Sequence, residues 1–350
     1  VQVRRVMAAL EEAEKPLICI GGGVFAAHAE NEIRELADLM QIPVITTMMG
    51  ISVFPDDDQL FCGMIGTHGV KMANAAVNEC DVLFLVGARV GDRAVKTPLA
   101  LEKTTKIIHI DIDPAEIGKN IGADLPLVGD AKLVLQQMTE LAKPMKHDEW
   151  IAHIKTLGGE RKYVEPAKGT VNPRVFIDRL AKKMPANVTV VADVGQNQIW
   201  TCTEYKFRKE GRLLTSGGMG TMGYSVPAAI GAKMADDSRA TVAICGDGAF
   251  QMSFMELATA VQFGVDIKVV VMTNNRLGMV RELQTNGYHD RQTAVFLDGS
   301  PDFIKLAEAY GIPAMRVYDD DTMEKGVEML AEHKGICLVE VVVDKDMPTL

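Results

Sequence analysis

The sequence predicts an α/β protein made of two doubly wound parallel sheets, and three observations support this fold class. Short apolar segments alternate with segments of helical apolar spacing along most of the chain. A length of 350 residues exceeds one ordinary hydrophobic core. A polar stretch interrupts the alternation near the middle. We therefore predict a first domain over residues 1–143, a linker over 144–171 and a second domain over 172–350.

The first domain repeats a strand and helix pattern. Its expected strands are Pro16–Ile20, Val44–Thr47, Asp81–Val86 and Lys106–Ile112. Its expected helices are Glu30–Met40, Val70–Cys80 and Ala131–Leu141. Strands separated by helices pair in parallel, because a crossover returns the chain to the same edge of the sheet.

The second alternation follows a polar linker that contains one helix, Asp148–Leu157. It opens at Asn172, a favourable N-cap, with Pro173 at the first helical position. The expected strands are Val188–Val194, Arg212–Thr215, Ala240–Cys245, Ile267–Thr273, Ala314–Tyr318 and Ile336–Val343. The second domain is therefore a further parallel sheet.

Composition excludes several classes of function. The formal charge of −10 argues against nucleic acid or an anionic membrane as a partner, because both need a basic surface. No apolar run is long enough to span a membrane, and the first residues lack the core of a signal peptide. Six scattered cysteines indicate reduced core thiols and a cytoplasmic protein, since their spacing suits no zinc site.

The most informative motif is Gly246–Gly248, followed after 25 residues by Asn274 and Asn275. Apolar strands precede both parts, and the residues between them have helical spacing. Asp247 and Asn274 should therefore emerge together at the carboxyl edge of a parallel sheet, where such sheets bind ligands. Their oxygens suit Mg²⁺, which shares its shell with phosphate. The alternative is a Gly-Asp-Gly turn that meets an Asn-Asn loop by chance.

Glycines also follow the first strand of the first domain. Gly21, Gly22 and Gly23 stand where the backbone could approach a pyrophosphate. The pattern is not the full dinucleotide fingerprint, so a tight turn remains an alternative and an NAD-dependent dehydrogenase is disfavoured.

Together with the Gly246–Asn275 motif, four segments in order carry a resemblance to the catalytic large subunit of acetolactate synthase. They are His109–Asn120, Asp193–Trp200, Thr215–Tyr224 and Leu277–Val280. The resemblance covers nearly the whole chain. It implies a central flavin-binding domain followed by the diphosphate-binding domain of a thiamine-diphosphate enzyme. It also implies that the family's N-terminal pyrimidine-binding domain is missing, as in a truncated chain.

The resemblance assigns roles at the second domain. Asp247 and Asn274 would ligate Mg²⁺ through their side chains, and Arg276 through its carbonyl. The residues expected to hold thiamine diphosphate are Val194, Gly195, Gln196, Asn197, Gln198, Gly220, Met222, Gly246, Gly248, Ala249, Gly278 and Met279. Asn197 replaces the usual histidine, and its amide can still donate to a phosphate oxygen. Met222 would wedge beneath the cofactor.

The substrate pocket is expected at Met279, Val280 and Leu283. Leu283 stands where the family usually has tryptophan, which implies a wider acceptor pocket.

For the first domain the resemblance implies FAD. The matching residues are Gly21, Gly22, Gly23, Thr47, Met48, Thr67, His68, Gly69, Gly87, Ala88, Arg89, Asp92, Arg93, Asp111, Ile112, Gly129 and Asp130. Gly91 stands where the family usually has an acid, which implies the loss of one flavin contact at that position. Arginine suits a diphosphate and Asp111 a ribose hydroxyl. For His68 and His109, a surface or capping role is the alternative.

The activity implied is that of a transferase in branched-chain amino-acid biosynthesis. Pyruvate would be decarboxylated and joined to a second 2-keto acid, pyruvate or 2-ketobutyrate. The alternatives are a glyoxylate carboligase, a pyruvate oxidase, a 2-keto-acid decarboxylase or a non-catalytic cofactor-binding fragment. The family's catalytic glutamate belongs to the N-terminal domain, so we assign no catalytic residue here and expect the chain alone to be inactive. The resemblance also implies a homodimer or homotetramer, with a small regulatory subunit as a further partner.

Overall fold

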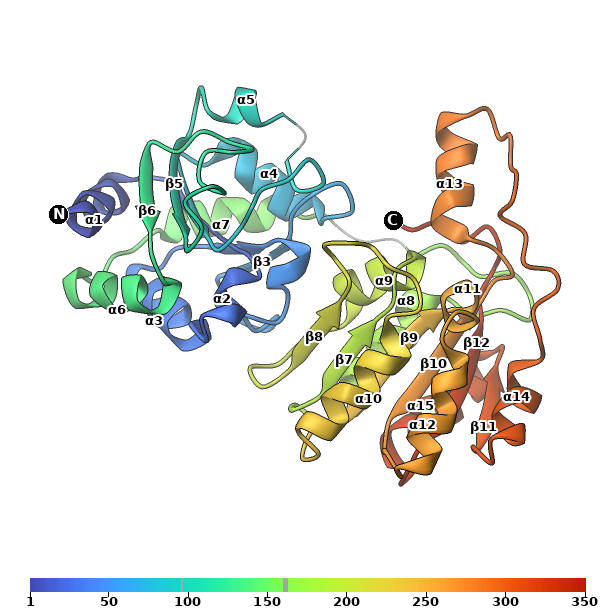
Figure 1. Ribbon diagram of the computed structural model, residues 1–350. Helices are drawn as coiled ribbons and strands as arrows, with labels where there is room; N and C mark the ends of the chain where they lie inside the picture. The colour runs from blue at the N-terminus through green and yellow to red at the C-terminus, as the bar shows by residue number, and fades with distance from the viewer. Residues whose placement is uncertain (96, 160–162) are drawn as a thin grey trace. The chain divides into compact units, whose positions relative to one another are not determined.

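The computed structural model describes residues 1–95, 97–159 and 163–350, which form two compact units (Figure 1). The units comprise Val1–Arg161 and Lys162–Leu350. Each contains one six-stranded sheet in which all paired strands run parallel. The predicted fold class is therefore confirmed.

The first sheet has the order β3-β2-β1-β4-β5-β6. Its strands are β1 (Pro16–Ile20), β2 (Val44–Thr46), β3 (Phe61–Met64), β4 (Val82–Val86), β5 (Lys106–Asp111) and β6 (Leu125–Val128). This order reverses between β1 and β4, because the chain continues from β1 to β2 on one side and from β4 to β5 on the other. Open α/β sheets bind ligands at such a switch point.

Helices cover both faces of the first sheet. They are α1 (Gln2–Glu12), α2 (Gly23–Ala26), α3 (Glu30–Met40), η1 (Met48–Gly50), α4 (Lys71–Glu79), α5 (Pro98–Leu101), α6 (Ala131–Leu141) and α7 (Asp148–Thr156). Alternate residues of β1 enter different cores. Ile18 and Ile20 pack with α1, α3 and α6, whereas Leu17 and Cys19 pack with α4 and α7. The near-continuous apolar strand follows from this double burial.

Helix α7 falls within the predicted linker but packs on the first sheet. Trp150 is buried in the core that contains Leu17, and its Nε1 donates a hydrogen bond to the Pro16 carbonyl at 3.0 Å. Ile154 is fully buried in the same core. The helix thus belongs to the first compact unit, because its apolar face is covered there.

The second sheet has the order β11-β12-β10-β9-β7-β8. Its strands are β7 (Thr189–Ala192), β8 (Arg212–Thr215), β9 (Thr241–Gly246), β10 (Lys268–Thr273), β11 (Ala314–Val317) and β12 (Cys337–Val342). Its helices are α8 (Pro173–Lys183), α9 (Gln196–Glu204), α10 (Ser225–Ala235), α11 (Asp247–Phe250), η2 (Phe254–Glu256), α12 (Leu257–Gln262), α13 (Gly278–Gly287), α14 (Phe303–Ala309) and α15 (Asp320–Glu332). The order reverses between β7 and β9, which creates the switch point of this sheet.

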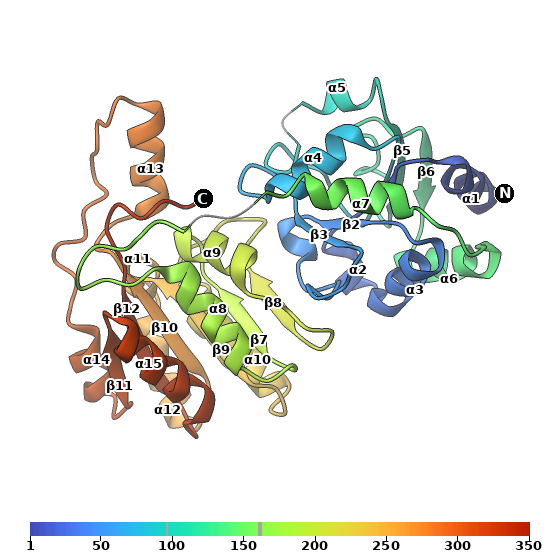
Figure 2. The ribbon, with the colours of Figure 1, turned by 180° about the vertical axis from the view of Figure 1, so that it is seen from behind.

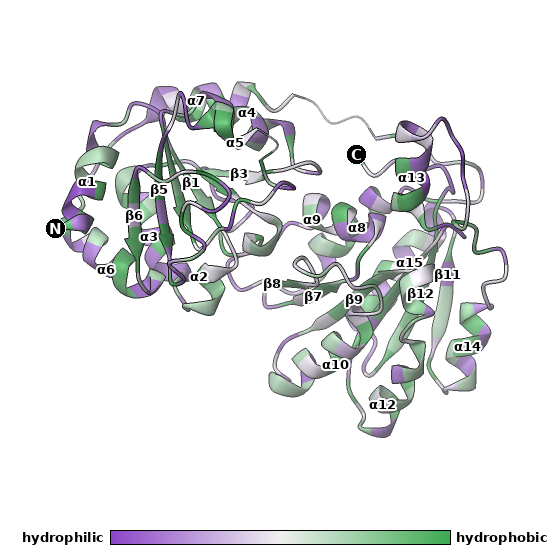
Figure 3. Ribbon diagram, turned by 45° about the horizontal axis from the view of Figure 1, so that its top comes forward, coloured by the Kyte–Doolittle hydropathy of each residue, from purple (hydrophilic) through white to green (hydrophobic). Residues whose placement is uncertain are grey.

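Helices also cover both faces of the second sheet. Helices α10 and α12 lie over one face in Figure 1, and α8 and α15 lie over the other in Figure 2. The predicted cap of α8 is present, because the Asn172 side chain accepts from the backbone N–H of Arg174 at 2.9 Å. Figure 3 shows predominantly apolar strands, whereas polar and apolar residues alternate along many of the helices.

The cysteines and the helices of the described chain each bear on an expectation from the sequence. All six cysteines are free and buried. Within the described ranges, no helix is long and apolar enough to cross a membrane.

Candidate active site at the second sheet

A cleft lies beyond the carboxyl ends of β7, β9 and β10, and it holds about 570 Å³ of space that is open to solvent. The carboxyl edge of a parallel sheet at a switch point is a usual place for a small-molecule ligand. The lining residues are Val194, Gly195, Gln196, Asn197, Trp200, Met222, Gly246, Asp247, Gly248, Ala249, Met272, Asn274, Arg276, Leu277, Gly278, Met279 and Val280. The cleft therefore occupies the switch point between β7 and β9.

Glycine backbone shapes the wall of the cleft. Gly195 precedes α9 with a φ of 147°, and a Cβ there would lie 2.7 Å from Asn197 Oδ1. A Cβ on Gly248 would lie 2.9 Å from Leu277 Cδ2. A side chain at either position would therefore crowd the cleft. The first turn of α9 starts here, and first-turn N–H groups of a helix lack intrahelical partners and favour phosphate.

Asp247 is the buried acid of the cleft, with an exposed fraction of 2%. Its Oδ2 accepts from the backbone N–H of Asn275 at 2.6 Å and of Asn274 at 3.2 Å, and its Oδ1 accepts from that of Gly248 at 2.8 Å. Burial raises the pKa of the carboxyl to about 6, although these backbone donors oppose the shift. A cation bound beside it would favour the charged form.

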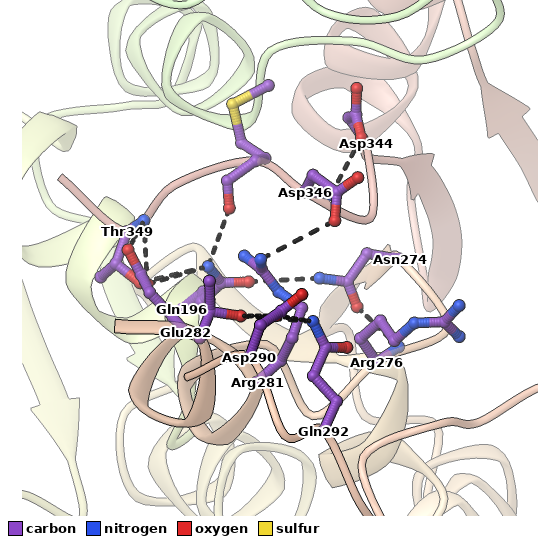
Figure 4. Close-up of polar contacts among 12 residues, drawn as sticks. Gln196, Asn274, Arg276, Arg281, Glu282, Asp290, Gln292, Asp344, Asp346 and Thr349 are labelled. Carbon is purple, nitrogen blue, oxygen red and sulfur yellow. Dashed lines mark hydrogen bonds and ion pairs between the residues drawn. The ribbon is translucent and has the colours of Figure 1, made fainter. Parts of the chain in front are cut away.

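Asn274 lies beside Asp247, as the sequence predicts for the ends of neighbouring parallel strands. Its Oδ1 accepts from the backbone N–H of Arg276 at 3.0 Å, and its Nδ2 donates to Gln196 Oε1 at 3.2 Å (Figure 4). Asn275 has a φ of 54°, a left-handed conformation that asparagine tolerates better than most residues. This turn brings the N–H of Asn275 to Asp247.

The Arg276 side chain is bound to other residues and not to the Asp247 carboxylate. Its Nη1 forms an ion pair with Asp298 at 2.9 Å, and its guanidinium lies over the Phe296 ring at 4.6 Å from the centroid. Arg276 thus lines the cleft while its charge is held elsewhere. Only its backbone oxygen would be available for the ligand role expected from the sequence.

The sequence leads us to expect that Asn197 donates to a phosphate oxygen, but its side-chain nitrogen already has protein partners. Its Nδ2 donates to the carbonyls of Asp193 at 2.8 Å and Ile244 at 3.1 Å. The amide therefore ties the end of β7 to the end of β9, and only its oxygen remains for other contacts. An amide oxygen accepts hydrogen bonds and cannot donate them to phosphate.

Most residues predicted for this site line the cleft, but three do not. Gln198 donates to Thr215 Oγ1 at 2.6 Å, Gly220 lies in the loop before α10, and Leu283 is 62% exposed on α13. Trp200, Met272 and Leu277 line the cleft without having been predicted. Trp200 and Leu277 lie in the segments Asp193–Trp200 and Leu277–Val280, which carry the family resemblance. Their membership of these segments could have identified them as site residues.

The glycines of the first unit serve close backbone packing. A Cβ on Gly21 would lie 2.1 Å from the Gly87 oxygen, and one on Gly23 would lie 2.7 Å from Gly87 Cα. The N–H of Gly21 donates to the Val86 carbonyl at 2.9 Å, and that of Gly23 donates to the Gly87 carbonyl at 3.0 Å. The loops after β1 and β4 therefore meet at the switch point, where the sequence places a nucleotide.

Other predicted nucleotide residues have local partners. Asp130 caps α6 by accepting from the N–H of Leu133 at 3.0 Å, and Asp111 accepts from that of Asp113 at 3.0 Å. The backbone of Thr67 donates to the Arg93 carbonyl at 2.8 Å, while the Arg89 carbonyl accepts from Asn120 at 2.7 Å. His109 is a buried residue of β5 and not a surface or capping histidine.

Two family models match successive parts of the chain. Residues 3–138 match the central domain of thiamine pyrophosphate enzymes, and residues 193–341 match their C-terminal TPP-binding domain. The chain belongs to the thiamine pyrophosphate enzymes. Every residue that lines the cleft lies within the matched TPP-binding domain.

The curated relatives of this chain include large subunits of acetolactate synthase. The probable acetolactate synthase large subunit of Methanocaldococcus jannaschii is 39% identical over 98% of this chain and 60% of its own length. The acetolactate synthase large subunit of Lactococcus lactis is 35% identical, with the same coverage of 98% and 60%. That of Corynebacterium glutamicum is 39% identical over 90% of this chain and 52% of its own length. The chain thus spans little more than half the length of these relatives.

Proposed function

We propose that this chain carries the Mg²⁺ and diphosphate site of an acetolactate synthase catalytic subunit. The observation that supports this most is the adjacent pair Asp247 and Asn274 at the switch point of a TPP-binding domain. In the described residues, no three His, Cys, Asp or Glu side chains gather as a metal site. A cation at Asp247 would therefore take its remaining ligands from the diphosphate, as Mg²⁺ commonly does.

The donor set fits this group. The Asp247 carboxylate, the Asn274 amide oxygen and the Arg276 carbonyl are hard oxygen donors on consecutive strand ends. The glycine backbone at Gly195, Gly246, Gly248 and Gly278, with the first turn of α9, would hold the diphosphate. Met222 packs within reach of Gly248, because a Cβ there would lie 3.3 Å from Met222 Cε. Met222 would thus support the cofactor from the side of the loop before α10.

Thiamine diphosphate, when bound, supplies the carbanion chemistry that decarboxylates a 2-keto acid and joins it to a second one. The chain's own residues orient the diphosphate and shape the substrate space. Met279 and Val280 line the cleft, whereas Leu283 projects to solvent from α13. We propose that pyruvate is both the donor and the acceptor. Met279 and Val280 would form the wall of the pocket on the side of the acceptor.

Binding tests the site itself. We expect Asp247→Ala to abolish Mg²⁺-dependent binding of thiamine diphosphate, measured by titration calorimetry, because the buried metal ligand is lost. Asp236→Ala is the matched control, since Asp236 lies in an exposed turn between α10 and β9. Unchanged affinity in Asp247→Ala would contradict the proposal.

Products test the activity. With pyruvate, thiamine diphosphate, Mg²⁺ and FAD, the chain expressed within its complete reading frame should form 2-acetolactate, and Asp247→Ala should not. Acetaldehyde would indicate a decarboxylase instead, peroxide an oxidase, and tartronate semialdehyde from added glyoxylate a glyoxylate carboligase.

We further propose that FAD binds the first unit at the meeting of the loops after β1 and β4. The strand order, the close approach of Gly21 and Gly87, and the match to the central domain support this site. Flavin fluorescence should be quenched on binding. Gly21→Val should prevent the quenching, because its side chain would collide with the Gly87 backbone.

Association into at least a homodimer is also part of the proposal. Large apolar side chains of the second unit are exposed, namely Met219 at 91%, Met252 at 58% and Met255 at 53%. Large exposed apolar side chains are a feature of surfaces that a partner covers. Sedimentation analysis with and without a small regulatory subunit would measure both kinds of association.

A further inference from the structure

The carboxamide of Gln196 links the proposed metal ligand to the last residues of the chain. Its Oε1 accepts from Asn274 Nδ2 at 3.2 Å, while its Nε2 donates to the Met347 carbonyl at 2.9 Å and to Thr349 Oγ1 at 3.1 Å (Figure 4). Both ends of the amide are therefore used. Gln196 is 4% exposed, so these bonds form away from bulk water.

Helix α13 supplies the next layer of this arrangement. The backbone N–H of Thr349 donates to Glu282 Oε1 and Oε2, each at 3.3 Å, and the Thr349 hydroxyl donates to the same carboxylate. Gln196 Nε2 also lies 3.5 Å from Glu282 Oε2. The carboxylate thus holds the threonine beside Gln196.

The rest of the C-terminal segment is anchored independently. Trp200 Nε1 donates to the Pro348 carbonyl at 3.1 Å, and Arg174 Nη2 donates to the Thr349 carbonyl at 2.6 Å. Met347 and Thr349 are 4% and 3% exposed. The segment 347–349 is therefore a fixed part of the second unit, and the acceptor that it offers Gln196 is held in place.

These contacts determine the orientation of both amides. A rotated Gln196 carboxamide would present its NH₂ group to the NH₂ group of Asn274 and its oxygen to the Met347 carbonyl, so both bonds would be lost. The fixed Gln196 oxygen in turn binds the nitrogen of Asn274. The Asn274 oxygen must then face the other way, toward the Arg276 backbone. An amide oxygen has two acceptor positions, so one remains for a cation.

Space restricts Gln196 as well. A Cβ on Gly278, at the start of α13, would lie 1.8 Å from Gln196 Oε1. The glutamine therefore occupies the volume that a side chain at position 278 would need. The absence of a side chain at Gly278 is what allows the approach to Asn274.

We propose that Gln196 is a positioning residue that presents the Asn274 oxygen to the metal, and that segment 347–349 with Glu282 holds it in that role. This inference rests on the proposed function of Asp247 and Asn274. It gives the Gln196 side chain an action through Asn274 and not directly on the diphosphate. Residues that orient metal ligands commonly affect metal affinity by about 10- to 100-fold.

A double-mutant cycle tests this role. Gln196→Leu, Asn274→Ala and the double variant are titrated with Mg²⁺ at fixed thiamine diphosphate, and quenching of tryptophan emission is recorded because Trp200 lines the cleft. We expect Gln196→Leu to weaken Mg²⁺ at least about tenfold. In the Asn274→Ala background it should cause no further loss, because the group that it orients is gone.

Additive losses in the cycle, or an unchanged Mg²⁺ affinity in a folded Gln196→Leu, would overturn the inference. Gln284→Leu is the matched control, because Gln284 lies on α13 outside the cleft and bonds the Thr293 backbone. Thr349→Val removes one acceptor of Gln196 without touching the cleft and should reproduce part of the loss. If Gln196→Leu does not fold, Thr349→Val becomes the test of the inference. An unchanged Mg²⁺ affinity in Thr349→Val would then overturn the role of segment 347–349.

The outcome is separable from that of the proposed function. If Asp247→Ala abolishes Mg²⁺-dependent binding while Gln196→Leu has no effect, only the positioning role fails. If Asp247→Ala leaves binding unchanged, the site itself fails, whatever the Gln196 variants do.

Discussion

The sequence predicts that Asp247 and Asn274 lie close together. It does not predict the hydrogen bonds of the residues around them. The pairing follows from parallel strand topology, which brings consecutive strand ends to one edge. The partner of the Asn197 amide depends on where the Ile244 carbonyl lies, 47 residues away. Residue types state what a side chain can donate or accept, but only neighbours in space decide which groups it meets.

Gly195 allows a sharp test at the residue scale. We expect Gly195→Ala to lower the stability of the second unit by about 1–3 kcal/mol and to weaken binding of thiamine diphosphate. The reasons are the φ of 147° and the contact of 2.7 Å that a Cβ would make with Asn197. Denaturant unfolding and calorimetry measure the two effects.

The control for this prediction is Gly231→Ala. Gly231 lies inside α10, and a Cβ there would meet nothing within 4 Å. Alanine in a helix interior is better than glycine by about 0.5–1 kcal/mol, so this variant should be more stable. Equal effects at the two positions would contradict the strain argument.

The cysteines should be unreactive in the folded chain. Burial raises the pKa of Cys19, Cys62, Cys80 and Cys202 from 9.0 to about 12. The thiolate is the reactive form of cysteine. At pH 8 about one-tenth of a free thiol is ionised, whereas only about one molecule in ten thousand is ionised when the pKa is about 12. A thiol reagent should therefore label the chain at pH 8 only after unfolding.

The same shift has a consequence for stability. A thiol whose pKa is higher in the folded state contributes stability that is fully present below pH 9. This contribution is lost as the pH rises toward about 12, because only the unfolded chain then ionises readily.

The labelling experiment has a contrary outcome. Rapid labelling of native protein at pH 8 would show that the thiols are exposed by local opening.

At the scale of elements, most strands and amphipathic helices were predictable, and the two edge strands of the first sheet were not. The bounds of β1, β8, α3 and α6 agree with the prediction, but β3 and β6 were missed. Both are short edge strands, with Gly63 in β3 and Pro126 in β6. Edge strands tolerate these residues because they bond on one side only, so their sequences carry a weak strand pattern.

Helix α7 packs on the first sheet although the polar composition of its segment predicts a linker. It lies in the polar stretch that suggests a linker, yet Trp150 and Ile154 enter the first core. We expect Ile154→Ala to lower the stability of the first unit by about 2–5 kcal/mol, as for other buried large-to-small changes. Thermal unfolding followed by Trp150 emission measures this loss.

Lys155→Ala is the control, because Lys155 is an exposed residue of the same helix. It should change stability little. A small effect of Ile154→Ala would mean that α7 contributes no stability to the first unit and behaves as the linker that the sequence suggested.

On the scale of the whole molecule, each unit has its own sheet and buried core. A ligand that binds one folded unit stabilises that unit by about 2.7 kcal/mol at about 100 times its Kd. We expect calorimetry to resolve two transitions, with Mg²⁺ and thiamine diphosphate raising the one that belongs to the second unit. FAD should raise the other transition. Equal shifts of both by one ligand would contradict this assignment.

The sequence by itself determined the fold class, the positions of most strands along the chain and the juxtaposition of Asp247 with Asn274. These features depend on local periodicity and on the rule that parallel strand ends share an edge. The tertiary structure alone decided the packing of α7 and the partners of Asn197. It also decided the bonding of Gln196 to Thr349, which lies 153 residues away. Contacts of this kind depend on three-dimensional proximity between distant segments, and no local pattern of residues encodes them.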